Sequence, residues 1–156
     1  MTEFRIICVG KVKEAFFRDG IESFLGEIRR YHRAEILECA DEPTPDMCPA
    51  AEERAILQKE GERILKRIRP EDYVIALCID GKRYSSEAWI RHMRPVLRQK
   101  EKGEGAVTFV IGGSLGLSEA VIRRADEKLS FSGLTFPHQM MRMILCQQIS
   151  VLAKST

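Results

Sequence analysis

The sequence predicts an α/β fold, a mainly parallel sheet with helices on both faces. Short apolar segments rich in β-branched residues alternate with longer amphipathic segments along the whole chain. Two of the short segments, 74–79 and 106–111, are apolar at successive positions, as strands buried on both faces are. The chain has 156 residues, 44% of them hydrophobic, which is enough for one domain with a core. We therefore expect residues 1–156 to form a single domain.

The first part of the chain predicts a strand, a helix, a second strand and a loop. Residues 4–10 are apolar and β-branched, which favours a buried strand. Over residues 14–31 apolar side chains recur at spacings of three and four, the pattern of an amphipathic helix. Residues 34–40 have the composition of a second strand. The two prolines of segment 41–46 cannot extend it, so a loop follows.

The middle of the chain repeats this alternation. Pro49 is suited to open a helix that reaches about Arg69, and Pro70 stops it. Residues 73–80 form a third predicted strand, after which Gly81 and Lys82 turn away. A third helix then runs from Ser85 or Ser86 to Lys100, because a serine side chain can cap a free backbone amide.

The last part predicts two more strands and two more helices. Residues 106–111 form a fourth strand, and 112–117 is a glycine-containing loop. Ser118 can cap a short helix to about Glu127. Residues 129–136 are expected to form the fifth strand, and Pro137 opens the last helix. The apolar stripe of this helix comprises Met140, Met141, Ile144, Leu145, Ile149 and Leu152.

Charge and composition exclude several classes of protein. Lys and Arg number 25 against 23 Asp and Glu, a formal net charge of +2, so the chain lacks the imbalance of a strongly basic DNA-binding protein. No apolar run approaches the roughly 20 residues of a membrane-spanning helix, and no leader segment is apparent. We expect a cytoplasmic protein that binds neither a membrane nor DNA. The five cysteines and the histidines show no metal-ligand spacing, which predicts no metal site.

Ligands of parallel sheets bind beyond the carboxyl ends of the strands, here the loops after Gly10, Asp80, Ile111 and Phe136. The glycines of segment 112–116 allow backbone amides to approach a ligand, which favours a nucleotide pocket. A tight turn that needs positive φ explains them equally well. His138 can likewise face a ligand or cap its own helix. Spacing alone leaves these alternatives open.

Four segments, at the spacing found here, make the sequence resemble a known family. They are Val9-Gly10-Lys11, the stretch from Leu77 to Lys82, Phe109-Val110-Ile111-Gly112-Gly113-Ser114, and the stretch from Leu129 to Arg142 that contains Thr-Phe-Pro-His. Together they resemble the RlmH family of SPOUT-class methyltransferases, which methylate N3 of a pseudouridine in large-subunit ribosomal RNA.

The resemblance implies a C-terminal trefoil knot, a homodimer, and S-adenosylmethionine as the cofactor bound in the knotted loops. It implies the ribosome as partner, and it places His138 and Arg142 near the reacting nitrogen, with no metal required. A non-catalytic homodimer that binds S-adenosylmethionine or a nucleotide is the alternative. The cofactor-binding residues that the resemblance implies are Leu77, Gly112, Phe131, Ser132, Gly133, Leu134, Thr135 and Phe136.

The chain departs from the family after about residue 149. Members of the family continue with Tyr-Arg-Ala-x-Lys-Ile and a Pro-Tyr-His tail, whereas this chain reads Ser-Val-Leu-Ala-Lys-Ser-Thr over residues 150–156. A one-base deletion in a Tyr codon can convert one reading into the other. We therefore expect that 150–156 arose by a frameshift, that the helix survives it, and that RNA recognition is impaired.

Overall fold

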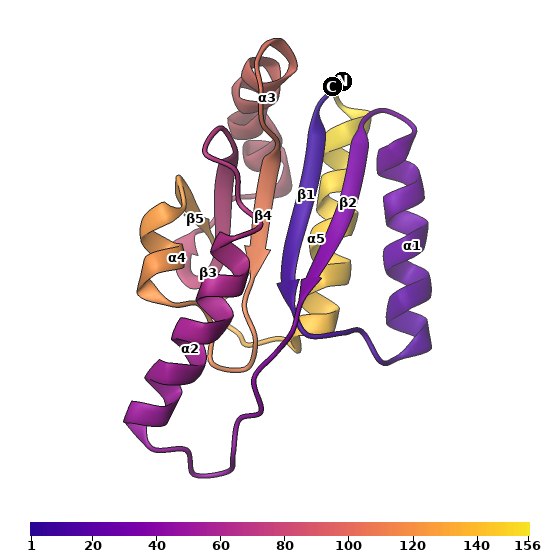
Figure 1. Cartoon of the computed structure of the whole chain (residues 1–156). Coiled ribbons are helices and arrows are strands. Elements are labelled where there is room, and N and C mark those ends of the chain that lie inside the picture. The colour runs from indigo at the N-terminus through magenta and orange to yellow at the C-terminus, as the bar shows by residue number, and fades with distance from the viewer.

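Five strands and five helices alternate along the chain in a computed structural model that describes all 156 residues (Figure 1). Their order confirms the predicted α/β class. The elements are β1 (Glu3–Val9), α1 (Ala15–Arg29), β2 (Arg33–Cys39), α2 (Ala50–Leu65), β3 (Tyr73–Lys82), α3 (Ser86–Lys102), β4 (Val107–Ile111), α4 (Glu119–Arg124), β5 (Glu127–Leu129) and α5 (His138–Lys154).

The strands form one parallel sheet in the order β2-β1-β4-β3-β5. Ile6 of β1 pairs with Ile36 on one side and with Phe109 on the other. Because every neighbouring pair is parallel, all five carboxyl ends lie at one edge of the sheet, the lower edge in Figure 1. The loops after β3, β4 and β5 therefore meet there.

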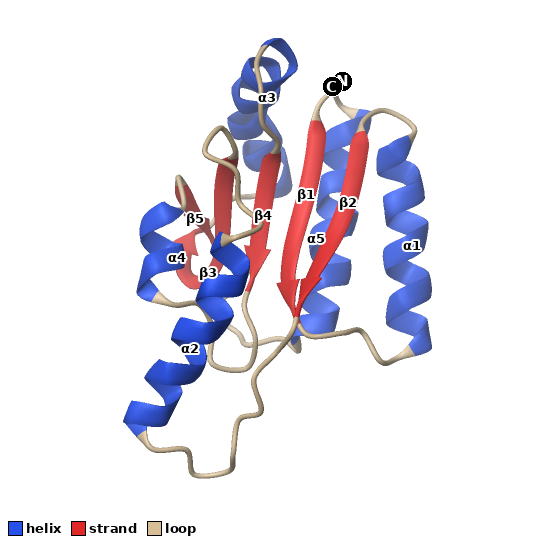
Figure 2. Ribbon diagram, in the orientation of Figure 1, coloured by secondary structure: helices blue, strands red, loops and turns tan.

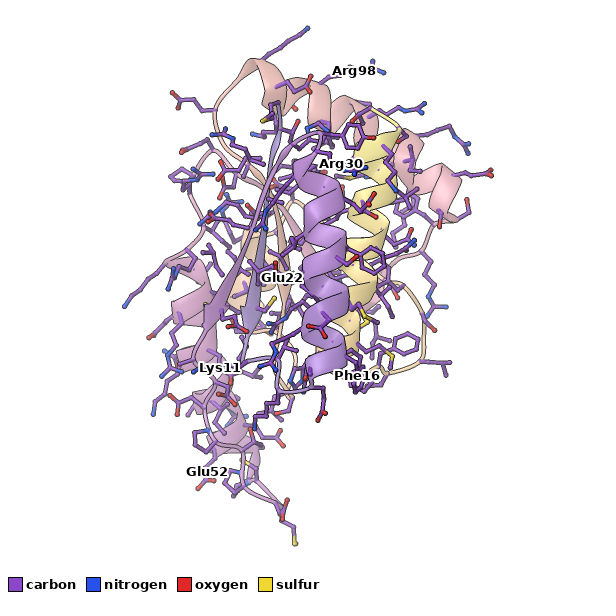
Figure 3. The ribbon with its side chains drawn as sticks, turned by 90° about the vertical axis from the view of Figure 1, so that its right-hand side faces the viewer. Lys11, Phe16, Glu22, Arg30, Glu52 and Arg98 are labelled. Atoms are coloured by element: carbon purple, nitrogen blue, oxygen red, sulfur yellow. The ribbon has the colours of Figure 1, made fainter.

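Helices cover both faces of the sheet, as the apolar strands require (Figure 2). On one face α1, α3 and α5 enclose the larger core, in which Trp89 packs against Phe109. Helices α1 and α5 run side by side on this face (Figure 3). On the other face α2 and α4 enclose a smaller core around Ile64, Val74 and Val121.

The predicted fifth strand over 129–136 is wrong in its bounds. The strand is β5, residues 127–129, and the segment 130–136 leaves the sheet. Its polar groups are satisfied locally, because Ser130 Oγ donates to the carbonyl of Ser132 and Ser132 Oγ accepts the amide of Leu134. Such side-chain turns compete with a strand ladder. The segment is consequently a loop at the carboxyl edge of the sheet.

Two neighbouring predictions are also corrected. β3 continues through Gly81 and Lys82 rather than turning away after Asp80. Gly81 lies close against β5, where a Cβ on it would be 2.7 Å from the carbonyl carbon of Leu129, and the pairing of β3 with β5 shifts register between Leu77 and Lys82. Helix α4 ends at Arg124 and does not reach Glu127 as predicted. Glu127 is instead the first residue of β5.

The last helix continues to Lys154, which confirms that segment 150–156 does not end it early. Leu152 and Ala153 are buried in the larger core. The two chain ends lie together (Figure 1), bridged by His32, whose ring contacts the amide of Thr2 at 3.2 Å and Thr156 Oγ1 at 2.9 Å. None of the helices has the length and hydropathy needed to cross a membrane.

Candidate cofactor site

A cavity of about 390 Å³ opens at the carboxyl edge of the sheet. Its wall consists of residues 77–79 of β3, Ile111 at the end of β4, the glycine loop (112–116), the segments 129–132 and 134–136, and two residues of α5, His138 and Met141. A stretch of β3 and the segments that follow β4 and β5 thus converge on one space. The volume lies within the roughly 300–1,000 Å³ typical of small-molecule sites.

The structure brings most of the predicted site residues into this wall. Seven of the eight predicted cofactor-binding residues line it: Leu77, Gly112, Phe131, Ser132, Leu134, Thr135 and Phe136. His138 joins them because Pro137 starts α5 beside the cavity. Of the four loops selected from the sequence, those after Gly10 and Asp80 contribute nothing to the wall, because the lining residues of β3, 77–79, precede Asp80.

Gly133 does not line the cavity. It is exposed, and a Cβ built on it would lie 2.8 Å from the guanidinium nitrogen Nη2 of Arg83. Its neighbours Ser132 and Leu134 form part of the wall. Gly133 therefore lies on the outer side of the loop, where a contiguous motif could not distinguish it from its neighbours.

Arg142 also lies outside this cavity. Its guanidinium is buried, with Nη1 donating to Glu38 at 2.7 Å and Nη2 to the carbonyl of Gly10 at 3.2 Å. It contributes to a second cavity beside α1, to which Lys11 and Arg18 belong as well. The helical spacing of four residues puts His138 and Arg142 one turn apart, but the chain directs only His138 toward the first cavity.

The glycine loop contains the tight turn that its sequence allows. Gly116 has φ +85°, the left-handed region that glycine tolerates, and its amide donates to the carbonyl of Gly113 at 3.1 Å. Gly112 is needed for space, because a Cβ there would lie 2.4 Å from the carbonyl oxygen of Gly116. The amides of Ser114 and Leu115 find no acceptor within the chain, so they remain available to a ligand.

Glu60 of α2 is a functional candidate that the sequence predictions missed. It is 4% exposed, and its carboxylate lies behind the glycine loop, with Oε1 3.2 Å from the Cβ that Gly113 would carry. Burial raises the pKa of this carboxyl, although its bond from the backbone of Glu42 opposes the rise. The signal was present, since Glu60 is spaced by four residues from Ile56 and Ile64 on the apolar face of the helix.

The cavity wall has two titratable side chains, Cys78 and His138. Burial raises the pKa of the Cys78 thiol, with the nearby Asp80 carboxylate adding to the effect. A thiol with a raised pKa stays protonated at neutral pH and is a poor nucleophile. The arrangement therefore provides binding groups and one imidazole, without an activated nucleophile of its own.

Comparison with known families defines the class of protein that has this fold and cavity. The sequence matches the model of the family described as "Predicted SPOUT methyltransferase" over residues 2–150. A probable methyltransferase from Bordetella pertussis Tohama I has a similar structure, with a TM-score of 0.54 at 16% identity, covering 97% of this chain and 96% of that one. This likeness concerns the fold alone. The class is that of the SPOUT methyltransferases.

Curated relatives identify the branch of that class. The chain is 46% identical to ribosomal RNA large subunit methyltransferase H of Streptococcus thermophilus over 145 residues, 93% of this chain and 89% of the relative. It is 43% identical to the protein of the same name from Desulfitobacterium hafniense over 149 residues, 96% of this chain and 91% of the relative. The chain therefore belongs to the ribosomal RNA large subunit methyltransferase H family.

Proposed function

We propose that this protein transfers a methyl group from S-adenosylmethionine to N3 of a pseudouridine in the large-subunit RNA of assembled ribosomes. The observation that carries the proposal is the 46% identity over 93% of the chain to a relative named for methylating large-subunit ribosomal RNA. The convergence of β3 and the segments after β4 and β5 on one cavity supports it independently. We also place the protein in the cytoplasm, where ribosomes are.

The cavity fits the proposed cofactor by size and chemistry. Leu77, Phe131 and Phe136 provide apolar walls for a flat base, and the free amides of Ser114 and Leu115 provide donors for its polar atoms. When bound, S-adenosylmethionine supplies an electrophilic methyl group on a sulfonium. No metal is needed for this chemistry, and the chain holds no cluster of three or more side chains suited to a metal.

The task of the protein side chains is to orient the acceptor nitrogen, exclude water and stabilise the charge that appears when N3 loses its proton. His138 lies in the cavity wall and is the side chain proposed to stabilise that charge. Arg142 is proposed to act through position rather than contact, because its bonds to Glu38 and Gly10 fasten the start of α5 to β1 and β2.

The test has two steps, binding and transfer. Calorimetry should show one S-adenosylmethionine bound per chain, and ribosomes that lack the modification should gain a labelled methyl group at the pseudouridine. His138→Gln should retain cofactor affinity and lose transfer. Binding without transfer by the unmodified chain would favour the non-catalytic cofactor-binding homodimer instead.

A further inference from the structure

We infer that Glu60 is a positioning residue of the cofactor site, which holds the glycine loop (112–116) in its binding shape by linking it to the loop after β2 (residues 40–46). This inference rests on the proposed function, because it concerns the same cavity. Glu60 does not itself line the cavity, so it would act through the loop that does.

Burying the carboxylate of Glu60 costs free energy. The carboxylate of Glu60 is 4% exposed, and while Oε2 accepts the backbone amide of Glu42 at 2.9 Å, Oε1 has no partner. A buried polar atom without a hydrogen bond is expensive, and an exception of this kind calls for a function. An apolar residue at this position would suit the smaller core better.

The glycine loop lies beside the unpaired oxygen of Glu60. A Cβ on Gly113 would be 3.2 Å from Oε1 and 3.5 Å from Oε2, so the carboxylate lies close to the loop at Gly113 and leaves no room for a side chain there. The same loop presents two backbone amides without acceptors, those of Ser114 and Leu115. Glu60 Oε1, which has no donor, thus lies beside the loop whose Ser114 and Leu115 amides have no acceptor. A small shift of the loop when the cavity fills would pair them.

The loop after β2 (residues 40–46) is bound to α2 by several side-chain contacts. Arg63, one turn after Glu60 on α2, donates to the carbonyl of Ala40 at 2.8 Å and forms an ion pair with Glu42. Thr44 approaches the glycine loop as well, with its hydroxyl 3.4 Å from that of Ser114. The loop after β2 is therefore anchored to α2, and Glu60 lies between this anchor and the glycine loop, beside the direct contact of Thr44 with Ser114.

The experiment measures cofactor affinity and kinetics in variants that keep the shape of the side chain. Glutamine has one acceptor oxygen where the carboxylate has two, so in Glu60→Gln an NH2 group must face either Glu42 or the glycine loop. We expect a rise of about tenfold or more in both the Kd and the KM for S-adenosylmethionine, with kcat and the melting temperature nearly unchanged. Glu62→Gln, an exposed position on the same helix, is the matched control and should leave all four quantities unchanged.

A double variant tests whether the effect passes through the contact with Gly113. Gly113→Ala places a methyl group against the carboxylate, and Glu60→Ala removes the carboxylate that it meets. Because both changes act on one contact, the loss of affinity in the double variant should be clearly smaller than the product of the single losses. Equal affinity of Glu60→Gln and the unmodified chain, or multiplicative losses in the double variant, would overturn the inference. Failure of the unmodified chain to bind S-adenosylmethionine would instead overturn the proposed function.

Discussion

At the scale of single residues, Gly112 decides whether the cavity exists in its observed shape. In Gly112→Val a Cβ would overlap the carbonyl of Gly116, 2.4 Å away, so the loop must change its path. We expect the variant to fold and to lose calorimetric binding of S-adenosylmethionine. Gly26→Ala on α1, where a Cβ meets nothing within 4 Å, should retain binding. Unchanged affinity in a folded Gly112→Val protein would contradict the assignment of the cavity.

Asp72 is expected to make the stability of the folded protein depend on pH. Its side chain is fully buried at the amino edge of the sheet, where it accepts the backbone amides of Arg69 at 3.0 Å and Ala106 at 2.9 Å and forms ion pairs with the guanidinium groups of Arg5 and Arg69. Burial alone would raise the pKa of Asp72, but these amides and guanidinium groups outweigh it and lower the pKa.

A lowered pKa in the folded state means that the ionised carboxylate stabilises the protein above the pKa of an unfolded Asp, about 3.9. This stability is lost as the pH falls through the folded-state pKa. Asp72→Asn should therefore lower the free energy of unfolding by about 3 kcal/mol at pH 7, and by progressively less as the pH falls below about 4. Urea unfolding at several pH values measures this. The exposed Asp46→Asn serves as the control, and a difference that does not vary with pH would refute the role of the charge.

At the scale of elements, α5 carries both cavity residues and the atypical segment 150–156. The helix survives that segment because Leu152 and Ala153 continue its apolar face, and Lys154 forms an ion pair with Glu27 of α1 at 2.8 Å. From the resemblance of the sequence we predict that residues 150–156 stand in place of groups that recognise the target base. Recognition of that base should then be weakened and cofactor binding intact, since the lining of the cavity ends at Met141.

Replacing residues 150–156 with the family's tail tests this directly. We expect methyl transfer to ribosomes to rise by at least tenfold, with the Kd for S-adenosylmethionine unchanged. Equal transfer by the two proteins would show that the tail is dispensable. Sequencing the gene tests the frameshift separately, because an in-frame Ser codon at position 150 with no family-like tail in the shifted frame would exclude it.

At the scale of the whole molecule, exposed apolar side chains on α1, α5 and the loop before α5 favour a homodimer. Phe16 of α1 is 65% exposed and Leu134 of the loop before α5 is 71% exposed, while Met140 and Ile144 of the predicted stripe are only half-buried. Figure 3 shows Phe16 at the end of α1 nearest the carboxyl edge of the sheet. Exposed apolar groups of this size are typical of an interface. Light scattering at micromolar concentration should give twice the chain mass of 17.8 kDa, and a monomeric mass would refute the dimer.

The sequence by itself determined the alternation of elements and the edge of the sheet at which the cavity opens. Both follow from periodicity, because it records which face of each helix or strand is apolar. Only the tertiary structure decided that segment 130–136 leaves the sheet, that Gly133 faces outward and Arg142 lies in another cavity, and that Glu60 packs behind Gly113. These facts depend on strand order and on contacts between distant segments. A buried polar side chain interrupts the periodic pattern in the sequence, but the pattern does not show which loop that side chain faces.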